Sequence, residues 1–538
     1  MKRVNMLESL SDNIVIDKAK CTACGICVDK CILDNLRLNL SPCRQACPLG
    51  VNCQGYVQLI ARGEEDKAME ILRETLPFPG ILGRICSQPC EDSCHRRQTD
   101  GEAVAVRALK RYLADCFKDG EVALPQIEVD TGHKVAVVGS GPAGMMAAFD
   151  LRTRGHHVTV FEADEAPGGM LRWAIPDFRM PQSVLEQELD LLRRMGVDFR
   201  CGVALGKDRS LEELKQTHQA VVIAIGCPEY TRLNSEDENL PGVYYGLPFL
   251  REVRAGRRPA VGAKVVVIGG GNVAVDAAQT ALRLGAAEVA MVCLESEEEV
   301  PAFRTAINGA LAEGVKLECS WGSVKFLSSG GKLEGVSFQR CLKVFDECGQ
   351  FEPVFDSCEL KDLQADTVIV AIGQQRNTAL LTQIGLSEEL IAQVDQLTLQ
   401  TADEKVFIAG DVASGPSSVV DAMAKGRQAA ESVHRYLQGE HMRYGRRYAG
   451  PVETEFEIET DGNKSVPRAK IPEKLYAGNG DFKEIEEAFD TQTARKEASR
   501  CHSCGTPFGK YRTCWFCLPC EVECPNDALY VEIPYLLR

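Results

Sequence analysis

The chain has 538 residues, enough for three or four domains that each bury a hydrophobic core. Apolar residues make up 45% and charged residues 26%, the composition of an ordinary globular protein, so wholesale disorder is excluded. The formal charge of -16 would repel a phosphate backbone, so no nucleic-acid partner is expected. The start, MKRVNMLESLSDN, lacks the apolar core of a signal peptide, and no stretch approaches the roughly 20 apolar residues of a membrane span. We therefore expect a cytoplasmic protein without membrane insertion.

Cysteine is the unusual component of the composition. Of the 24 cysteines, 16 fall in short-spaced groups near the two ends of the chain, and the others are scattered between them. In a reducing cytosol such grouping predicts metal ligands rather than disulfides. We interpret the scattered cysteines as ordinary buried thiols. These are Cys116, Cys201, Cys227, Cys293, Cys319, Cys341, Cys348 and Cys358.

The sequence pattern changes several times along the chain. Residues 13–40 alternate apolar and polar residues on both sides of a cysteine loop, which predicts strand, metal loop and strand, and residues 41–118 have helical periodicity. A pattern of apolar strand, glycine turn and helix begins at KVAVVGSGPAG and again, about 130 residues later, at KVVVIGGGNVAVD. After residue 440 the sequence turns polar, and a short charged helix, predicted from FKEIEEAF and ARKEASR, leads to the last cysteines.

The first glycine motif lies between a strand and a helix and consists of Gly139, Gly141 and Gly144. Glycines there allow a tight turn and let the helix N-terminus approach a pyrophosphate. The next strand ends at Glu162, which is placed to accept hydrogen bonds from a ribose. Far downstream, VFIAGDVAS predicts a strand ending at Gly410 and Asp411, where an acid suits the hydroxylated chain of a flavin. We expect FAD rather than FMN, because FMN lacks the diphosphate and the second ribose.

The second glycine motif has the same place in the second pattern and consists of Gly269, Gly271 and Ala274. Because it is inserted between the two halves of the first, it predicts an α/β fold with two Rossmann-type domains that hold two nucleotides face to face. Hydride transfer between them is the natural use. An alternative, in which one unit binds nothing, stays open.

Several separate motifs, in the order in which they follow one another along the chain, resemble those of the glutamate synthase small-subunit family of FAD-dependent pyridine-nucleotide oxidoreductases. They are GSGPAGMMAAFDLRTRGHHVTVFEADEAPGGMLRWAIPDFRMP, GGGNVAVDAAQTALRLGAAEV and VFIAGDVASGPSSVVDAMAKGRQAA. The helical region, with PCRQACPLGVNCQGYVQLI and PFPGILGRICSQPCEDSC, resembles the iron-sulfur domain of that family and of dihydropyrimidine dehydrogenase. The resemblance covers roughly Ser41 to Leu437.

This resemblance implies FAD in the first site, with Gly169 and Met170 among its contacts, and NAD(H) or NADP(H) in the second, with Asn272 among its contacts. It also implies 4Fe-4S clusters beside the flavin, about three or four in the chain. Thioredoxin-reductase-like flavoproteins take electrons from the flavin through a Cys-x-x-Cys pair. No such pair occurs between Cys94 and Cys501, so electrons are expected to leave through the clusters.

The motifs divide the chain into predicted segments. They are a ferredoxin-like half (1–40), a helical iron-sulfur domain (41–120), the N-terminal half of an FAD domain (130–245), an NAD(P)-binding domain (246–370), the C-terminal half of the FAD domain (371–440), a linker with short helices (441–500) and a C-terminal ferredoxin-like segment (501–538).

The cysteine groups at the two ends have the C-x2-C-x2-C-x3-C spacing of a bacterial ferredoxin loop. They are Cys21, Cys24, Cys27 and Cys31, followed by Ile32 in place of the usual proline, and Cys514, Cys517, Cys520 and Cys524, followed by Pro525. For the first group a zinc site is the alternative. The pair Cys501 and Cys504 is interpreted as extra cluster ligands or as half of a zinc site.

The middle group consists of Cys43, Cys47, Cys53, Cys86, Cys90 and Cys94. In the resembled family the positions of Cys47, Cys86 and Cys90 serve one cluster, and those of Cys43 and Cys94 serve another that also uses an upstream cysteine pair. That pair is missing at the expected distance before Cys43, and Lys110 stands about where dihydropyrimidine dehydrogenase uses a glutamine ligand. One cluster is therefore expected, a second is left open, and Cys53 is a candidate for filling a gap.

The two ferredoxin-like ends suggest a further hypothesis. In a two-cluster ferredoxin the fourth cysteine of each loop ligates the other half's cluster. Residues near 14–40 and 514–533 are expected to meet, within one subunit or between two, so that Cys21, Cys24 and Cys27 share a cluster with Cys524, and Cys514, Cys517 and Cys520 share one with Cys31. The alternative is two separate modules, with Cys501 or Cys504 completing the C-terminal one.

Together these features predict an electron-transfer subunit of a hetero-oligomeric complex. It exchanges hydride with NAD(P)H at FAD and passes single electrons through the clusters to ferredoxin or another redox subunit, with or without electron bifurcation, and no side chain is singled out as catalytic. The competing hypotheses are a glutamate synthase small subunit and a non-catalytic scaffold subunit.

The nucleotide is expected to be NADH. NADPH-using relatives carry an arginine pair where this chain has Leu294 and Glu295, and a carboxylate there accepts hydrogen bonds from ribose hydroxyls but repels a 2′-phosphate. Two alternatives remain: Glu295 merely begins the acidic run Glu297 to Glu299, or Arg304 turns toward a phosphate.

Overall fold

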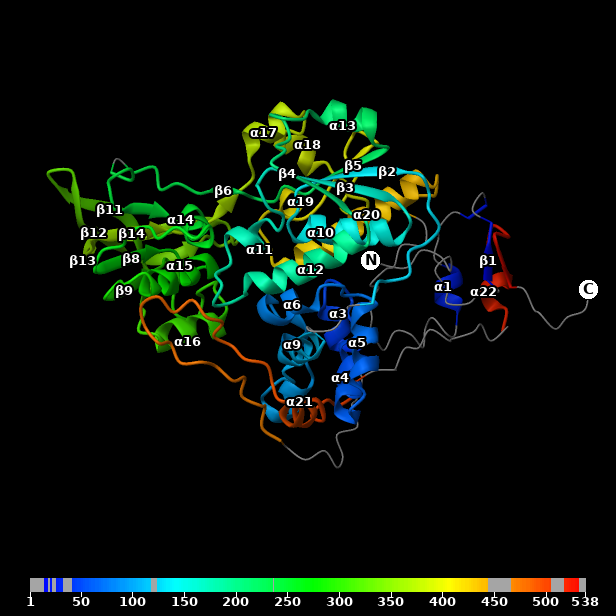
Figure 1. Ribbon diagram of the computed structural model, residues 1–538, viewed down its shortest axis with the longest axis horizontal. Coiled ribbons are helices and arrows are strands. Elements are labelled where there is room, and N and C mark those ends of the chain that lie inside the picture. The colour runs from blue at the N-terminus through cyan, green and yellow to red at the C-terminus, as the bar shows by residue number, and fades with distance from the viewer. Residues whose placement is uncertain are drawn as a thin grey trace, which may run out of the picture.

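The computed structural model describes residues 14–17, 20–21, 26–31, 41–117, 123–235, 237–443, 466–504 and 517–531. They form two lobes with parallel sheets, a helical domain packed against the first lobe, and a small module that contains both described ends of the chain (Figure 1). Among these residues, no helix is both long enough and apolar enough to cross a bilayer.

The first lobe is a parallel sheet with strand order β16-β5-β2-β3-β4. Its strands are β2 (Lys134–Val138), β3 (His157–Glu162), β4 (Asp198–Cys201), β5 (Ala220–Ile223) and β16 (Val406–Ile408). The central strands are runs of Val, Ile and Phe that are buried on both faces, as a parallel sheet between helices requires. One face packs against α10 (Pro142–Thr153), α12 (Gln182–Arg194) and α20 (Val419–Leu437), and the other against α13 (Leu211–Thr217), α17 (Thr378–Gln383) and α18 (Glu388–Ala392).

The second lobe is inserted between β5 and β16 of the first, which confirms the predicted arrangement of two Rossmann-type domains. Its parallel sheet has the order β10-β9-β8-β14-β7, with β7 (Val243–Tyr245), β8 (Lys264–Ile268), β9 (Glu288–Val292), β10 (Lys316–Glu318) and β14 (Thr367–Val370). Its helices are α14 (Gly246–Arg254), α15 (Asn272–Arg283) and α16 (Arg304–Ala312).

Helices α14, α15 and α16 pack on one face of this parallel sheet, and a three-stranded antiparallel sheet covers the opposite face. The sequence patterns did not predict this antiparallel sheet. It consists of β11 (Trp321–Ser329), β12 (Lys332–Phe345) and β13 (Phe351–Gln364). Phe326 and Phe338 pack in one core with Val266 of β8. Where the chain passes between the lobes, β6 (Glu229–Tyr230) pairs with β15 (Gln374–Gln375), so the two crossings lie side by side.

The helical domain lies below the first lobe in Figure 1 and shares one hydrophobic core with it. Its helices are α3 (Pro42–Ala46), α4 (Cys53–Arg62), α5 (Glu65–Arg73), α6 (Pro79–Ile85), α7 (Pro89–Asp92), α8 (Arg96–Asp100) and α9 (Val106–Cys116). The rings of Phe78 and Phe149 meet edge to face across the boundary, with centroids 5.9 Å apart. The Gly80 amide donates to Glu188 Oε1 at 2.7 Å, so apolar and polar contacts both attach the domain.

A helix from near the C-terminus, α21 (Thr491–Ala498), packs against α4 and α9 of the helical domain. The prediction that FKEIEEAF is helical is wrong, because this segment is extended. Its acidic side chains pair instead with arginines of the helical domain, Glu484 with Arg84 at 2.7 Å and Glu486 with Arg107 at 2.7 Å. The helix begins after Asp490, whose carboxylate accepts from the Thr493 amide as an N-cap.

The two described ends of the chain meet in the small module at the right of Figure 1. Strand β1 (Ile14–Ile16) pairs antiparallel with β17 (Leu529–Val531), and α1 (Ile26–Lys30) contacts α22 (Pro519–Val522). The expected meeting of the ends therefore occurs within one chain. The second strand predicted for the N-terminal half, LRLNL, lies outside the described residues.

Helices α10 and α20 approach so closely that alanine is too large for one position between them. A Cβ atom at Gly426 would lie 2.1 Å from the Ala143 carbonyl oxygen, so one helix would have to move. We expect Gly426→Ala to lower the free energy of unfolding by about 2 kcal/mol, which differential scanning calorimetry would show as a lower Tm.

The matched control is Gly309→Ala in α16, another glycine inside a helix. Nothing lies within 4 Å of the Cβ position there, so the better helix propensity of alanine should stabilise the protein by about 0.5 to 1 kcal/mol. Equal Tm values for the two variants would contradict the close α10–α20 contact.

Candidate functional site

The first glycine motif forms the turn between β2 and α10. Gly139 has φ +101°, and its Cβ would lie 2.4 Å from the Ala224 carbonyl oxygen, while a Cβ at Gly144 would lie 2.0 Å from the Gly139 carbonyl oxygen. Both glycines are therefore needed for close backbone packing. Gly141, at the N-terminus of α10, has nothing within 4 Å of its Cβ position. That open space at a helix N-terminus fits a diphosphate.

Glu162, at the end of β3, turns toward the same glycine turn. Its carboxylate accepts from the Ser140 amide at 3.0 Å and from the Asp164 amide at 2.9 Å, and it is buried. Gly169 also lies against this turn, since its Cβ would be 2.8 Å from Gly141 Cα. The structure thus brings together the residues that the sequence placed around the diphosphate and ribose, and Met170 begins the adjacent α11 (Met170–Trp173).

Gly410 and Asp411 follow β16 at the start of α19 (Asp411–Ser414). Gly410 packs on α10, with its Cβ position 2.7 Å from Ala143 Cβ. The Asp411 carboxylate accepts from Ser417 Oγ at 2.6 Å, and burial raises the pKa of this carboxyl group despite that hydrogen bond. The predicted flavin-chain ligand therefore lies beside α10, at the carboxyl edge of the same sheet.

The second site repeats this arrangement between β8 and α15. Gly269 has φ +133° and a Cβ position 2.2 Å from the Ala371 carbonyl oxygen, whereas Gly271 again has open space. Glu295 follows β9, and its Oε2 lies 3.0 Å from the Cβ position of Gly270, beside the turn. Asn272 Oδ1 accepts from the Phe303 amide at 3.1 Å, so this side chain fixes the segment before α16.

The cysteines of the terminal module gather in one small core. Cys27, Cys31 and Cys520 are buried with Leu529 and Val531, and Cys524 packs against them. Cys21 is half-buried and Cys517 is exposed. Cys24 and Cys514 lie outside the described residues.

In the helical domain, the buried ammonium of Lys110 interacts electrostatically with four cysteines. Burial alone would lower the pKa of Lys110, but the thiols of Cys86, Cys90, Cys47 and Cys53 raise it above its usual value. Lys110 Nζ donates to the Leu82 carbonyl at 3.4 Å. Cys53 lies among these cysteines, and its hydrogen bonds with Cys43 and Cys90, together with burial, raise the pKa of its thiol. That Cys53 fills the gap in the ligand set stays a prediction.

A pocket is lined by Cys43, Cys53 and Cys94 of the helical domain together with Cys501 and Cys504. Burial and the nearby thiols raise the pKa of Cys501 to about 11 and that of Cys504 to about 12. The sequence analysis did not predict that Cys501 and Cys504 lie at this pocket. The Cys-x-x-Cys spacing of the two residues was the sequence feature that indicated a pair of ligands. Among the described residues no three His, Cys, Asp or Glu side chains are arranged to hold a single metal ion.

Two family models match the chain. The pyridine nucleotide-disulphide oxidoreductase family matches residues 133–426, and dihydropyrimidine dehydrogenase domain II with its 4Fe-4S cluster matches residues 6–122. These matches cover the two glycine sites and the cysteines from Cys21 to Cys94.

Curated relatives and solved structures agree with these matches. The beta subunit of an NADP(+)-dependent formate dehydrogenase from Moorella thermoacetica is 34% identical over 86% of this chain and 70% of its own length. The beta subunit of an NADPH-Fe(3+) oxidoreductase from Geobacter sulfurreducens is 32% identical over 86% of this chain and 75% of its own. The small chain of a glutamate synthase [NADPH] from Mycobacterium tuberculosis is 34% identical over 74% and 86%.

Among solved structures, a mutant of FprA from M. tuberculosis matches 57% of this chain and 85% of its own, with a TM-score of 0.50 and 19% identity, which supports the fold. The chain therefore belongs to the pyridine nucleotide-disulphide oxidoreductase family, as an FAD- and NAD(P)-dependent oxidoreductase of the glutamate synthase small-chain type that also carries a 4Fe-4S domain.

Proposed function

We propose that this chain is the subunit of a larger redox complex through which electrons pass between a pyridine nucleotide and a partner that accepts or donates them singly. The observation that carries the proposal is the shared core of the FAD lobe and the 4Fe-4S domain. Bound FAD supplies the conversion between a hydride and single electrons. Helix α6, which ends just before Cys86, packs against α12 and α20 of the FAD lobe.

Contacts along this boundary keep the two cofactor regions in a fixed relation. Arg427 of α20 donates to the Thr75 carbonyl at 2.7 Å, and its guanidinium also pairs with Asp150 of α10 at 2.8 Å. The hydrogen bond from Gly80 to Glu188 is a further contact across this boundary. The packed rings of Phe78 and Phe149 exclude water from the space between the two rings. A rigid boundary favours electron transfer because neither cofactor region has to move.

The terminal module is the proposed exit for electrons toward ferredoxin or another redox subunit. Val15 and Tyr530 are opposite each other in the β1–β17 pair, and each is 42% exposed. Val522 of α22 is 79% exposed. An apolar surface over a cluster-binding core suits a partner protein that must come close to the cluster.

A glutamate synthase small subunit stays the second candidate, because the small chain of that enzyme from M. tuberculosis is 34% identical over much of this chain. The terminal module of this chain, with its own cysteine core, favours an electron-transfer subunit over that alternative.

Two valine substitutions test the proposal. Gly141→Val fills the open space at the first helix N-terminus, so the purified protein should lose FAD, identified by chromatography after acid release, while it keeps its iron. Gly271→Val fills the equivalent space in the second lobe, so FAD should stay bound and respond to dithionite but no longer to NADH or NADPH.

The measurement is anaerobic stopped-flow absorbance of the flavin and the clusters. The wild-type protein should lose flavin absorbance on mixing with the nucleotide, followed by bleaching of the clusters. A wild-type protein whose bound flavin does not respond to either nucleotide would support the scaffold hypothesis instead.

NADH is the proposed nucleotide, although two of the relatives have NADP in their names. The Glu295 carboxylate lies beside Gly270 of the second turn, near where a ribose would follow the diphosphate. At that position a carboxylate favours the free hydroxyls of NADH.

We expect Glu295→Gln to raise kcat/KM for NADPH relative to NADH by about tenfold, equivalent to about 1.4 kcal/mol. The matched control is Glu297→Gln, an exposed acid in the following run, which should leave the ratio unchanged. A wild-type kcat/KM that is higher with NADPH would overturn the proposal. Equal effects of the two variants would show that the preference for NADH comes from the overall negative charge of this segment and not from Glu295.

The crossed ligation predicted for the terminal module can be tested with single-cysteine variants, because it specifies which variants should lose the same cluster. If Cys524 completes the cluster of Cys21 and Cys27, the EPR spectrum of Cys524→Ser should lose the same component as Cys21→Ser. Cys31→Ser and Cys520→Ser should lose the other component. The control is Cys358→Ser, an exposed cysteine of β13. Matching spectra of Cys524→Ser and Cys520→Ser would show two independent modules.

A further inference from the structure

We propose that Cys501 and Cys504, near the C-terminus, complete a 4Fe-4S site with Cys43 and Cys94 of the N-terminal helical domain. The pair would take the place of the upstream cysteines that this chain lacks before Cys43. These four cysteines line one pocket together with Cys53, Gln54 and His502.

Helix α21 places the pair against this pocket. Ala494 and Ala498 are completely buried in the core of the helical domain, so one face of α21 is packed against α4 and α9. Two side chains of α4 then hold the segment after the helix. Gln58 Nε2 donates to the Cys501 carbonyl at 3.2 Å, and Gln54 Nε2 donates to Ser503 Oγ at 3.0 Å.

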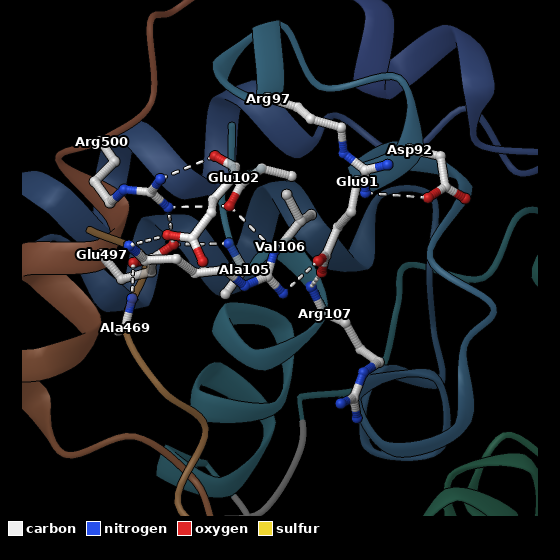
Figure 2. A network of polar contacts seen from close by, with 12 residues as sticks. Glu91, Asp92, Arg97, Glu102, Ala105, Val106, Arg107, Ala469, Glu497 and Arg500 are labelled. Atoms are coloured by element: carbon white, nitrogen blue, oxygen red, sulfur yellow. Dashed lines mark hydrogen bonds and ion pairs between the residues drawn. The ribbon is translucent and has the colours of Figure 1, made fainter. Parts of the chain in front are cut away.

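A buried ion pair fixes the residue just before the first cysteine. Arg500 and Glu497 are completely buried and lie 2.8 Å apart. Glu497 accepts from the Ala105 amide at 2.8 Å and from the Ala469 amide at 2.7 Å. Figure 2 shows how this pair joins the loop before α9 to the C-terminal segment.

Three further N–H groups of Arg500 donate to backbone carbonyls. Its guanidinium donates to Ala103 O at 3.0 Å, Glu102 O at 2.9 Å and Val466 O at 2.8 Å. A buried guanidinium held by four hydrogen bonds has a defined position, so it fixes the backbone just before Cys501 against residues 102–105 of the helical domain. Between the two cysteines, Ser503 has φ +56°, a conformation that turns the chain back within three residues.

The division of the cysteines supports the assignment. With Cys501 and Cys504 assigned to Cys43 and Cys94, the remaining cysteines of the 43–94 group are Cys47, Cys53, Cys86 and Cys90. Eight thiols thus form two groups of four, the number that a 4Fe-4S cluster requires. The assignment rests on the proposed function only in that both need clusters in this domain.

The test uses Cys501→Ala, Cys504→Ala, Cys43→Ala and Cys94→Ala in the full chain, with Cys116→Ala as the matched control. Cys116 is exposed at the end of α9 in the same domain. Each of the four variants should lose about four iron atoms and four sulfides per chain, and all four should lose the same EPR component after dithionite reduction. Cys116→Ala should keep the wild-type iron content and spectrum.

FAD content and flavin reduction by NADH are expected to stay unchanged in every variant, which separates this assignment from the proposed function. Unchanged iron in Cys501→Ala and Cys504→Ala would overturn the assignment, and so would loss of zinc in place of iron. It would also fail if these two variants lost a different EPR component from Cys43→Ala.

Alkylation of the wild-type protein provides a second measurement that does not depend on how the variants fold. In the native protein iodoacetamide should modify Cys116 and Cys348, which are exposed, and spare the four proposed ligands. After the clusters are removed by oxidation in the presence of EDTA, mass spectrometry should find all four alkylated together. Alkylation of Cys501 and Cys504 in the native protein, with Cys43 and Cys94 protected, would contradict the proposal.

Discussion

The structure depends on a charged contact that is closed to water, the ion pair between Glu497 and Arg500. Moving two charges out of water costs several kcal/mol per ion, and only a complete set of hydrogen bonds offsets that cost. Here backbone amides and carbonyls from two separate segments, residues 102–105 and 466–469, provide these hydrogen bonds. The pair therefore joins α21 to the helical domain in a single register, and removing either partner would leave an unpaired charge in the core.

Helix α10 links the flavin site to the cluster domain. Gly141 at its N-terminus borders the open space of the dinucleotide turn, and Phe149, about 12 Å further along the helix, contacts Phe78 of the helical domain. The same helix is held at contact distance by Gly426 of α20. One short helix thus serves both cofactor regions, which explains why its packing tolerates so little side-chain volume.

The sequence predicted best what depends on neighbouring residues. A glycine turn between strand and helix is a local constraint, so the positions of Gly139 and Gly269 and the nested lobes were predictable. FKEIEEAF was assigned to a helix by its local pattern, but ion pairs with Arg84 and Arg107 hold it extended, and these pairs form only in the folded chain. The approach of Cys501 to Cys43 was equally hidden, because no spacing rule relates residues so far apart in the sequence.

The placement of α21 has a consequence for protein synthesis. Ala494 and Ala498 complete the core of a domain whose other helices end at Cys116. A ribosome adding 5 to 20 residues per second needs about 20 to 75 s to make the intervening chain. Throughout that interval the nascent helical domain presents an uncovered apolar surface on α4 and α9 beside Cys43 and Cys94. This surface stays uncovered until residues 491–504 have been made, so the domain reaches its mature form long after its own helices have been synthesised.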